Sequence, residues 1–214
     1  MEQTEKLKEI REQRYSELED VKQRNIVDMA LGFTAMMRLF EEGSKETIQA
    51  EILQRLPRFY ASRSEEVFKA AHNDFCMWGV GKILTAEKKK KGKVIKETAP
   101  ASYGHMAKIL DVVLHVVIRY AHRPDCQTAE RLSAWLNPAM DTRMMDFLAG
   151  CYPDALKPWP KTIEQVKEKD YEVIQQKVRQ FIKEEHQGKI LPVDFDDIYW
   201  EALNRKVARP AIEQ

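Results

Sequence analysis

Apolar residues recur along most of the chain with the three- and four-residue spacing that marks one face of an α-helix. The most apolar segments are residues 26–40 and the stretch from about 102 to 122. No segment alternates convincingly between apolar and polar residues, which would indicate a half-buried strand. The pattern therefore predicts an all-α protein, a single globular helical domain with no sheet beyond an incidental pair of strands.

The N-terminal segment differs from the rest of the chain in its charge. Residues 2–24 hold 13 charged side chains, and the apolar residues among them, at helical spacing, are Leu7, Ile10, Leu18 and Val21. A helix with so thin an apolar stripe contributes little to a core and suits packing on the body or on a second copy. We therefore expect a charged N-terminal helix over 1–24, a helical domain over 25–214, and the N-terminal helix as the site of any homo-oligomer.

Turn and capping residues divide the domain into further helices. Gly43 is expected to end the first core helix, and Ser44 to cap a second helix that Pro57 closes. Ser62 and Glu65 have the spacing of a capping box for the next helix. Further helices are expected over residues 127–136, 139–149 and 161–186, and a last one from Asp194.

The overall charge gives no general affinity for a polyanion. The chain has 35 basic and 34 acidic residues and a net charge of +1, so any basic surface must be local. The one lysine-rich segment, EKKKKGKVIKE over residues 87–97, is expected to be a solvated loop. Clustered lysines of this kind can contact phosphates.

Neither a membrane segment nor a disulfide framework is expected. The longest apolar stretch, from Ile109 to Ala121, carries three polar residues and is too short to span a bilayer. The charged N-terminus is unlike a secretory signal peptide. The three cysteines cannot all pair within one chain, and their neighbours suit small buried side chains. A cytoplasmic location is the expectation.

Polar residues on the helix of residues 102–122 lie on one stripe. They follow one another in steps of three, four, four and three, and are Lys108, Asp111, His115, Arg119 and His122. The rest of this helix is apolar, so we expect it to be buried, and we expect the stripe to be an accessible face that lines a groove or a second layer. An Asp–His pair four residues apart can form a dyad for general acid–base chemistry.

Three short motifs resemble the helix-hairpin-helix DNA glycosylase superfamily over residues 75–203. Residues 103–108 read Tyr-Gly-His-Met-Ala-Lys, similar to the end of the family's hairpin. Residues 138–143 read Pro-Ala-Met-Asp-Thr-Arg, similar to the stretch that holds its catalytic aspartate. Residues 195–200, Phe-Asp-Asp-Ile-Tyr-Trp, are similar to its closing helix.

The resemblance implies a base-excision DNA glycosylase/lyase. Lys108 would attack the sugar C1′ of an extruded nucleotide and form a Schiff base, and Asp141 would activate the attacking group. A lysine nucleophile must be neutral, which partial burial favours by lowering its pKa. The residues that would contact DNA are Gly104, His105, Lys88, Lys89 and Lys90. No cofactor and no metal are expected.

Other interpretations of the same residues remain open. Lys108 can be the start of a solvent-facing stripe and Asp141 a helix N-terminal charge, in a non-catalytic helical module for protein–protein interaction. A second lysine, Lys82, follows two glycines in Gly79-Val80-Gly81-Lys82 but has no matching aspartate downstream. Two further patterns are weaker: the four-residue pairs His72/Cys76 and His122/Cys126 as zinc ligands, and the Arg179/His186 spacing of some ribonucleases.

Overall fold

The computed structural model describes residues 2–90 and 93–204, apart from some side chains within those ranges. About 70% of the chain is helical, and the paired strands are short. The prediction of an all-α fold is therefore confirmed. None of the described helices is both long enough and apolar enough to cross a membrane.

The helices follow one another along the chain with one interruption by strands. The α-helices are α1 (Glu2–Phe33), α2 (Ser44–Ala61), α3 (Glu65–Lys82), α4 (Tyr103–Leu114), α5 (Cys126–Ser133), α6 (Thr142–Cys151), α7 (Glu168–His186) and α8 (Asp194–Asn204). A π-helical segment, η2 (His115–Tyr120), continues α4, and two 3-10 turns are η1 (Ala35–Leu39) and η3 (Ile163–Gln165). Strand β1 (Leu84–Thr85) pairs with β4 (Ala99–Pro100), and β2 (Lys88–Lys90) pairs with β3 (Lys93–Lys96).

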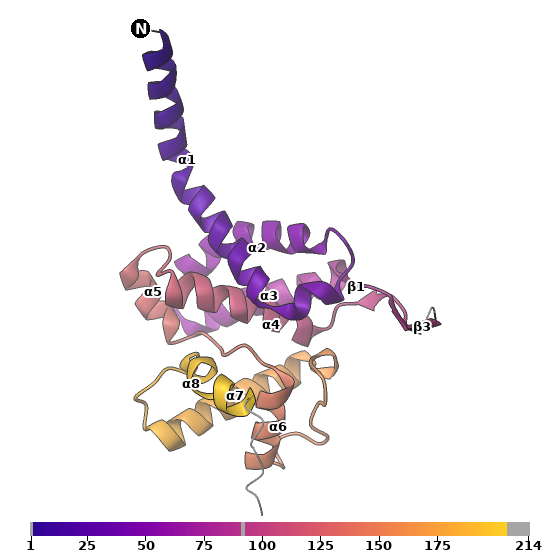
Figure 1. The fold of residues 1–214 in the computed structure, drawn as a ribbon. Coiled ribbons are helices and arrows are strands. Elements are labelled where there is room, and N and C mark those ends of the chain that lie inside the picture. The colour runs from indigo at the N-terminus through magenta and orange to yellow at the C-terminus, as the bar shows by residue number, and fades with distance from the viewer. Residues whose placement is uncertain (1, 91–92, 205–214) are drawn as a thin grey trace, which may run out of the picture.

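The helices form two groups, and α1 extends beyond both (Figure 1). Helices α2 to α5 and the C-terminal half of α1 make the upper group in this view, and α6 to α8 make the lower one. Val27, Ala30 and Leu31 near the end of α1 are fully buried, whereas Leu7 and Ile10 are exposed. The expected boundary at residue 24 therefore falls inside one continuous helix, near the point where α1 meets the body.

Helix α4 lies at the centre of the molecule. It contacts α1, α3 and α7, and its residues Met106, Ile109 and Leu110 are fully buried. A Cβ atom on Gly104 would collide with the backbone oxygen of Ile163, so only glycine allows the segment before α7 to approach α4 this closely. The burial of Val113, Val117 and Ile118 is as expected.

Several predicted helix ends are wrong. Pro57 does not close α2, which continues to Ala61. A proline removes one backbone hydrogen bond of the helix, and the buried side chains of Leu56 and Phe59 on either side offset that loss. Ser64, not Ser62, caps α3 and accepts from the amide of Val67.

The lysine-rich segment is a hairpin of strands rather than a loop. Strands β2 and β3 are antiparallel, with Lys88 opposite Lys96 and Lys90 opposite Lys93. The β-branched residues Val94 and Ile95 favour an extended backbone, which explains why this lysine-rich segment forms strands. Residues 91–92 and the side chains of Lys89 and Lys90 lie outside the described part. The hairpin extends sideways from the body (Figure 1).

The division of α1 into an exposed and a buried part can be tested by two matched substitutions. We expect Leu31→Ala to cost roughly 2–5 kcal/mol of stability, because it leaves a cavity in the core. We expect Leu18→Ala, at a side chain that is 38% exposed, to change stability by about 0.5 kcal/mol or less. Urea unfolding followed by circular dichroism measures both. Comparable losses would show that the N-terminal half of α1 belongs to the core.

Candidate functional site

The polar stripe of α4 and η2 is not an accessible face. Asp111 and His115 are only 2% and 6% exposed, and Lys108 is half-buried. The stripe faces the lower group of helices, which supplies polar partners for it. Arg119 pairs with Asp194 of α8 at 3.0 Å. The stripe therefore faces a second layer, one of the two expected arrangements, and the accessibility expected for Asp111 and His115 is wrong because that layer covers them.

Asp111 is the centre of a buried hydrogen-bond network. Its Oδ1 lies 3.0 Å from Nε2 of His72 in α3, and its Oδ2 accepts a 2.8 Å hydrogen bond from the hydroxyl of Tyr171 in α7. The rings of His72 and Tyr171 are stacked, with centroids 5.3 Å apart. One carboxylate thus connects α3, α4 and α7.

The network continues from Tyr171 toward the segment between α5 and α6. Asn137 Nδ2 donates to the hydroxyl of Tyr171 at 3.0 Å, and Arg179 donates to Oδ1 of Asn137 at 3.0 Å. The guanidinium of Arg179 also donates to the backbone oxygens of Trp135 and Leu136. Arg179 therefore holds this segment in place, which gives it a structural explanation without a ribonuclease site.

His72 and Cys76 contact each other. Nδ1 of His72 lies 3.6 Å from Sγ of Cys76. Burial acts to lower the pKa of His72, but the interactions with Cys76 and Asp111 raise it to about 10. Within the described ranges, no group of three or more histidine, cysteine or acidic side chains is arranged to hold a metal ion.

Lys108 differs from Arg119 of the same stripe in that its charge has no direct polar partner in the described part of the chain. Its ammonium has no hydrogen-bond or ion-pair partner among the residues that the structure describes. Burial lowers its pKa, and the charges of Asp141, Asp196 and Asp111, in that order of effect, act in the opposite direction. A half-buried lysine without a direct partner and with a lowered pKa is typical of an amine that reacts.

Two carboxylates whose charges act on Lys108 are held by backbone amides. Asp141 caps α6 and accepts a 2.8 Å hydrogen bond from the amide of Met144. Asp196 in α8 accepts a 2.7 Å hydrogen bond from the amide of Ala139. Burial raises the pKa of Asp196 to about 7, although the Ala139 amide lowers it. Asp196 can therefore donate or accept a proton near neutral pH.

The two predicted DNA-contacting residues of α4 are buried. Gly104 is packed against Ile163 and Val166. His105 is 3% exposed, exchanges hydrogen bonds with Ser102 in a capping box, and lies edge-on to the ring of Phe40. The packing against Ile163 and Val166 closes off Gly104, so its predicted contact with DNA is corrected, whereas the buried His105 lines the cavity described next. Moreover, α3 and α4 are joined by the β-segment rather than by a short hairpin.

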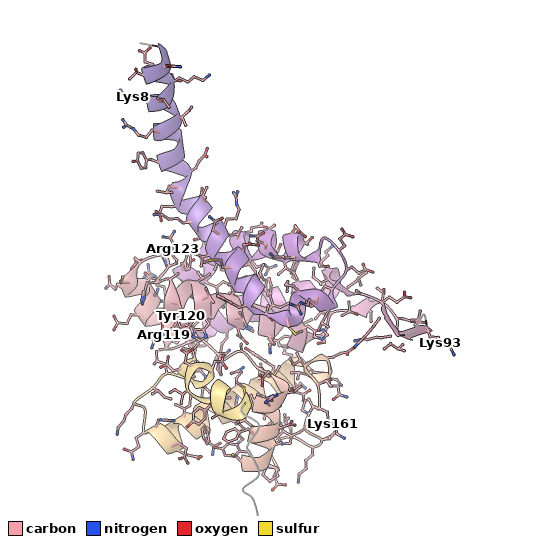
Figure 2. All side chains as sticks on the ribbon, in the orientation of Figure 1. Lys8, Lys93, Arg119, Tyr120, Arg123 and Lys161 are labelled. Atoms are coloured by element: carbon pink, nitrogen blue, oxygen red, sulfur yellow. The ribbon has the colours of Figure 1, made fainter. Side chains whose placement is uncertain are left out.

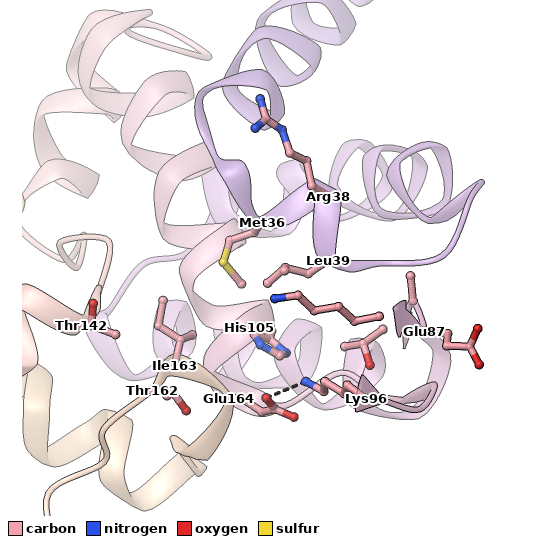
Figure 3. A pocket seen from close by; sticks show the side chains of 13 residues that line it. Met36, Arg38, Leu39, Glu87, Lys96, His105, Thr142, Thr162, Ile163 and Glu164 are labelled. Carbon is pink, nitrogen blue, oxygen red and sulfur yellow. Dashed lines mark hydrogen bonds and ion pairs between the residues drawn. The ribbon is translucent and has the colours of Figure 1, made fainter. Parts of the chain in front are cut away.

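A cavity of about 520 Å³ lies between the β2–β3 hairpin, η1 and the residues before α7 (Figure 3). Basic residues on its walls are Arg38, Lys88 and Lys96. Lys96 pairs with Glu164 at 2.6 Å across it. Thr142, the neighbour of Asp141, lies at the opposite side of the cavity from the hairpin (Figure 3).

Three residues of the site, His72, Tyr171 and Asp196, are not predicted from the sequence in the positions that the structure shows. The spacing of His72 and Cys76 predicts a metal-ligand pair, although two polar residues on the apolar side of a helix also indicate a buried network. Asp196 stands out in the sequence only as part of the closing-helix motif. Nothing in the spacing of Tyr171 marks it, because its role depends on how α7 crosses α4.

Comparisons with known proteins add no identification. A scan against protein-family models and searches of the curated proteins and of the solved structures find no match to this chain.

The buried network makes a prediction about pH. Because the pKa of His72 is raised to about 10, its contribution to stability is complete below about pH 6.5 and is lost as the pH rises toward 10. We expect the free energy of unfolding to fall between pH 6.5 and 10, and to fall less in His72→Gln. Urea titrations at several pH values measure this. Equal slopes in the two proteins would show that His72 is not charged in the folded state.

Proposed function

We propose that this protein is a DNA glycosylase/lyase-like enzyme in which Lys108 is the nucleophile. The observation that carries the proposal is the state of Lys108: half-buried, without a direct partner, with a lowered pKa and subject to the charges of Asp141 and Asp196. Burial raises the fraction of neutral amine, and only a neutral amine can attack carbon.

The proposed step is imine formation at C1′ of an abasic deoxyribose. Nζ of Lys108 adds to the aldehyde carbon, the nitrogen loses one proton, and the carbonyl oxygen takes up two, so that it leaves as water and the protonated imine remains. Asp196, with a pKa of about 7, suits the proton transfers to and from that oxygen. Asp141 contributes negative charge beside the positive charge that develops on the sugar.

DNA as the substrate is supported by the cavity beside the hairpin. Two of its basic residues, Arg38 and Lys88, can lie along a phosphate backbone. Lys96 is instead paired with Glu164, and the cavity is also lined by Glu87. The cavity also reaches Thr142, the chain neighbour of Asp141. The near-zero net charge requires such a local basic surface.

Borohydride trapping on oligonucleotides that contain an abasic site or a damaged base tests the proposal. We expect reduction of the imine to give a stable protein–DNA adduct, with Lys108 modified in peptide mass spectrometry. Lys108→Gln should abolish the adduct and leave DNA affinity largely unchanged. Asp141→Asn should slow base release without harming the fold, because asparagine is also a good N-cap.

Lys82→Gln is the matched control. Lys82 is an exposed lysine at the end of α3 and follows the glycines of the alternative motif. Its substitution should leave trapping unchanged. An adduct that persists in Lys108→Gln, or that forms at Lys82 instead, would contradict the assignment of Lys108.

A non-catalytic interaction module is the second candidate, and the exposed half of α1 favours it. Leu7, Ile10 and Leu18 are exposed on a helix that projects from the body (Figures 1 and 2). A second copy of the chain would cover this stripe. Two results together would favour this function over the enzyme. No oligonucleotide would give a borohydride-trapped adduct, and an oligomer would be lost on deletion of residues 1–18.

We also propose that the protein works in the cytoplasm. All three cysteines, Cys76, Cys126 and Cys151, are free thiols, which fits a reducing compartment.

A further inference from the structure

A second cavity, of about 430 Å³, lies between the end of α1, the π-helical segment η2 and the start of α8. One wall is apolar and consists of Val112, Val116 and Ala139. The rings of Phe33 and Tyr120 also line it, and these side chains are 72% and 55% exposed. Figure 2 shows Tyr120 where the two groups of helices meet. We call this the α1–η2–α8 cavity.

The polar wall of the α1–η2–α8 cavity presents acceptors. Asp196 and Asp197 both line it, and the hydroxyl of Tyr120 donates to Asp197. His115 is 6% exposed, and its Nε2 makes no hydrogen bond within the described part of the chain. That nitrogen lies 3.7 Å from Oδ2 of Asp197. The π-helical form of η2, which is frequent at functional sites, presents His115 and Tyr120 on the same side.

The charges around this cavity favour a cation. No lysine or arginine is among the described residues that line it, and the nearby Arg119 is paired with Asp194. Burial lowers the pKa of His115, although Asp197 and Asp194 act to raise it. A neutral imidazole does not repel a cation, and one of its ring nitrogens can accept a hydrogen bond.

We propose that the α1–η2–α8 cavity binds an alkylammonium group. The alkyl chain would lie on the apolar wall. The ammonium would donate to Asp197 and to His115, between the exposed rings of Phe33 and Tyr120, which attract a cation through their faces. Such a group can come from a free polyamine or from a lysine side chain of another protein. Lys108 does not line the cavity, and the ammonium contacts proposed here are with Asp197 and His115; Asp196, which is also assigned proton transfers beside Lys108, is shared by the two sites.

Binding of n-butylammonium, followed by ¹H–¹⁵N NMR, tests the proposal against its neutral analogue, 1-butanol. We expect saturable shifts of backbone amides in residues 112–120 and 196–197 with the ammonium and not with the alcohol. Asp197→Asn should weaken binding about fivefold or more, because it removes one charge beside the ligand. Phe33→Ala should weaken it about twofold to fivefold.

Asp146→Asn, at an exposed acid of α6 outside the cavity, is the matched control and should leave binding unchanged. Spermidine and a peptide with an unmodified lysine then distinguish the two sources, since the natural class should bind more tightly. Equal shifts with 1-butanol, no saturation with any of the three amines, or equal weakening in Asp197→Asn and Asp146→Asn would overturn the proposal. Backbone spectra of each variant show that it is folded.

Discussion

The burial of the Asp111 carboxylate is the constraint on which the rest of the structure depends. A buried charge of this kind is tolerated only when its hydrogen bonds are satisfied, and here His72 and Tyr171 satisfy both oxygens. These partners come from α3 and α7, in different groups of helices. The same contact therefore fixes how the lower group covers α4, and it turns the polar stripe toward α8.

The candidate site is a consequence of that arrangement. Once Asp111 is fixed, Lys108 lies one turn earlier on the same helix and is enclosed by the second layer. Arg179 also holds the segment between α5 and α6 through the backbone oxygen of Leu136. The same segment contains Ala139, whose amide donates a hydrogen bond to Asp196. The position of the acid beside Lys108 thus depends on structural contacts some distance along the chain. Burial lowers the pKa of the Lys108 amine and raises that of the Asp196 carboxyl, so both move toward neutral pH. Shifts of this kind suit a nucleophilic amine and a general acid.

Helical periodicity predicts the fold class, the core helix α4 and a helix that begins near Asp141, because these depend on local spacing. The predicted end of α2 at Pro57 is wrong, because the packing of Leu56 and Phe59 offsets the hydrogen bond that the proline removes. The predicted loop at the lysine-rich segment is wrong, because its β-branched residues favour strands. The burial of Asp111 and His115 could not be predicted from the helix alone. A stripe that faces solvent and one that faces a polar second layer have the same pattern, and only the partners on α3, α7 and α8 distinguish them.

The central proposal is that burial lowers the pKa of the Lys108 amine and so favours its neutral, nucleophilic form. A direct measurement of this pKa tests the proposal. Reductive methylation with ¹³C-formaldehyde gives each lysine an NMR signal that can be followed with pH, and the Lys108 signal is identified by its loss in Lys108→Gln. The account predicts a pKa below the ordinary value of 10.5, and a still lower one in Asp196→Asn, whose charge acts to raise it. A pKa at or above 10.5 would contradict the account.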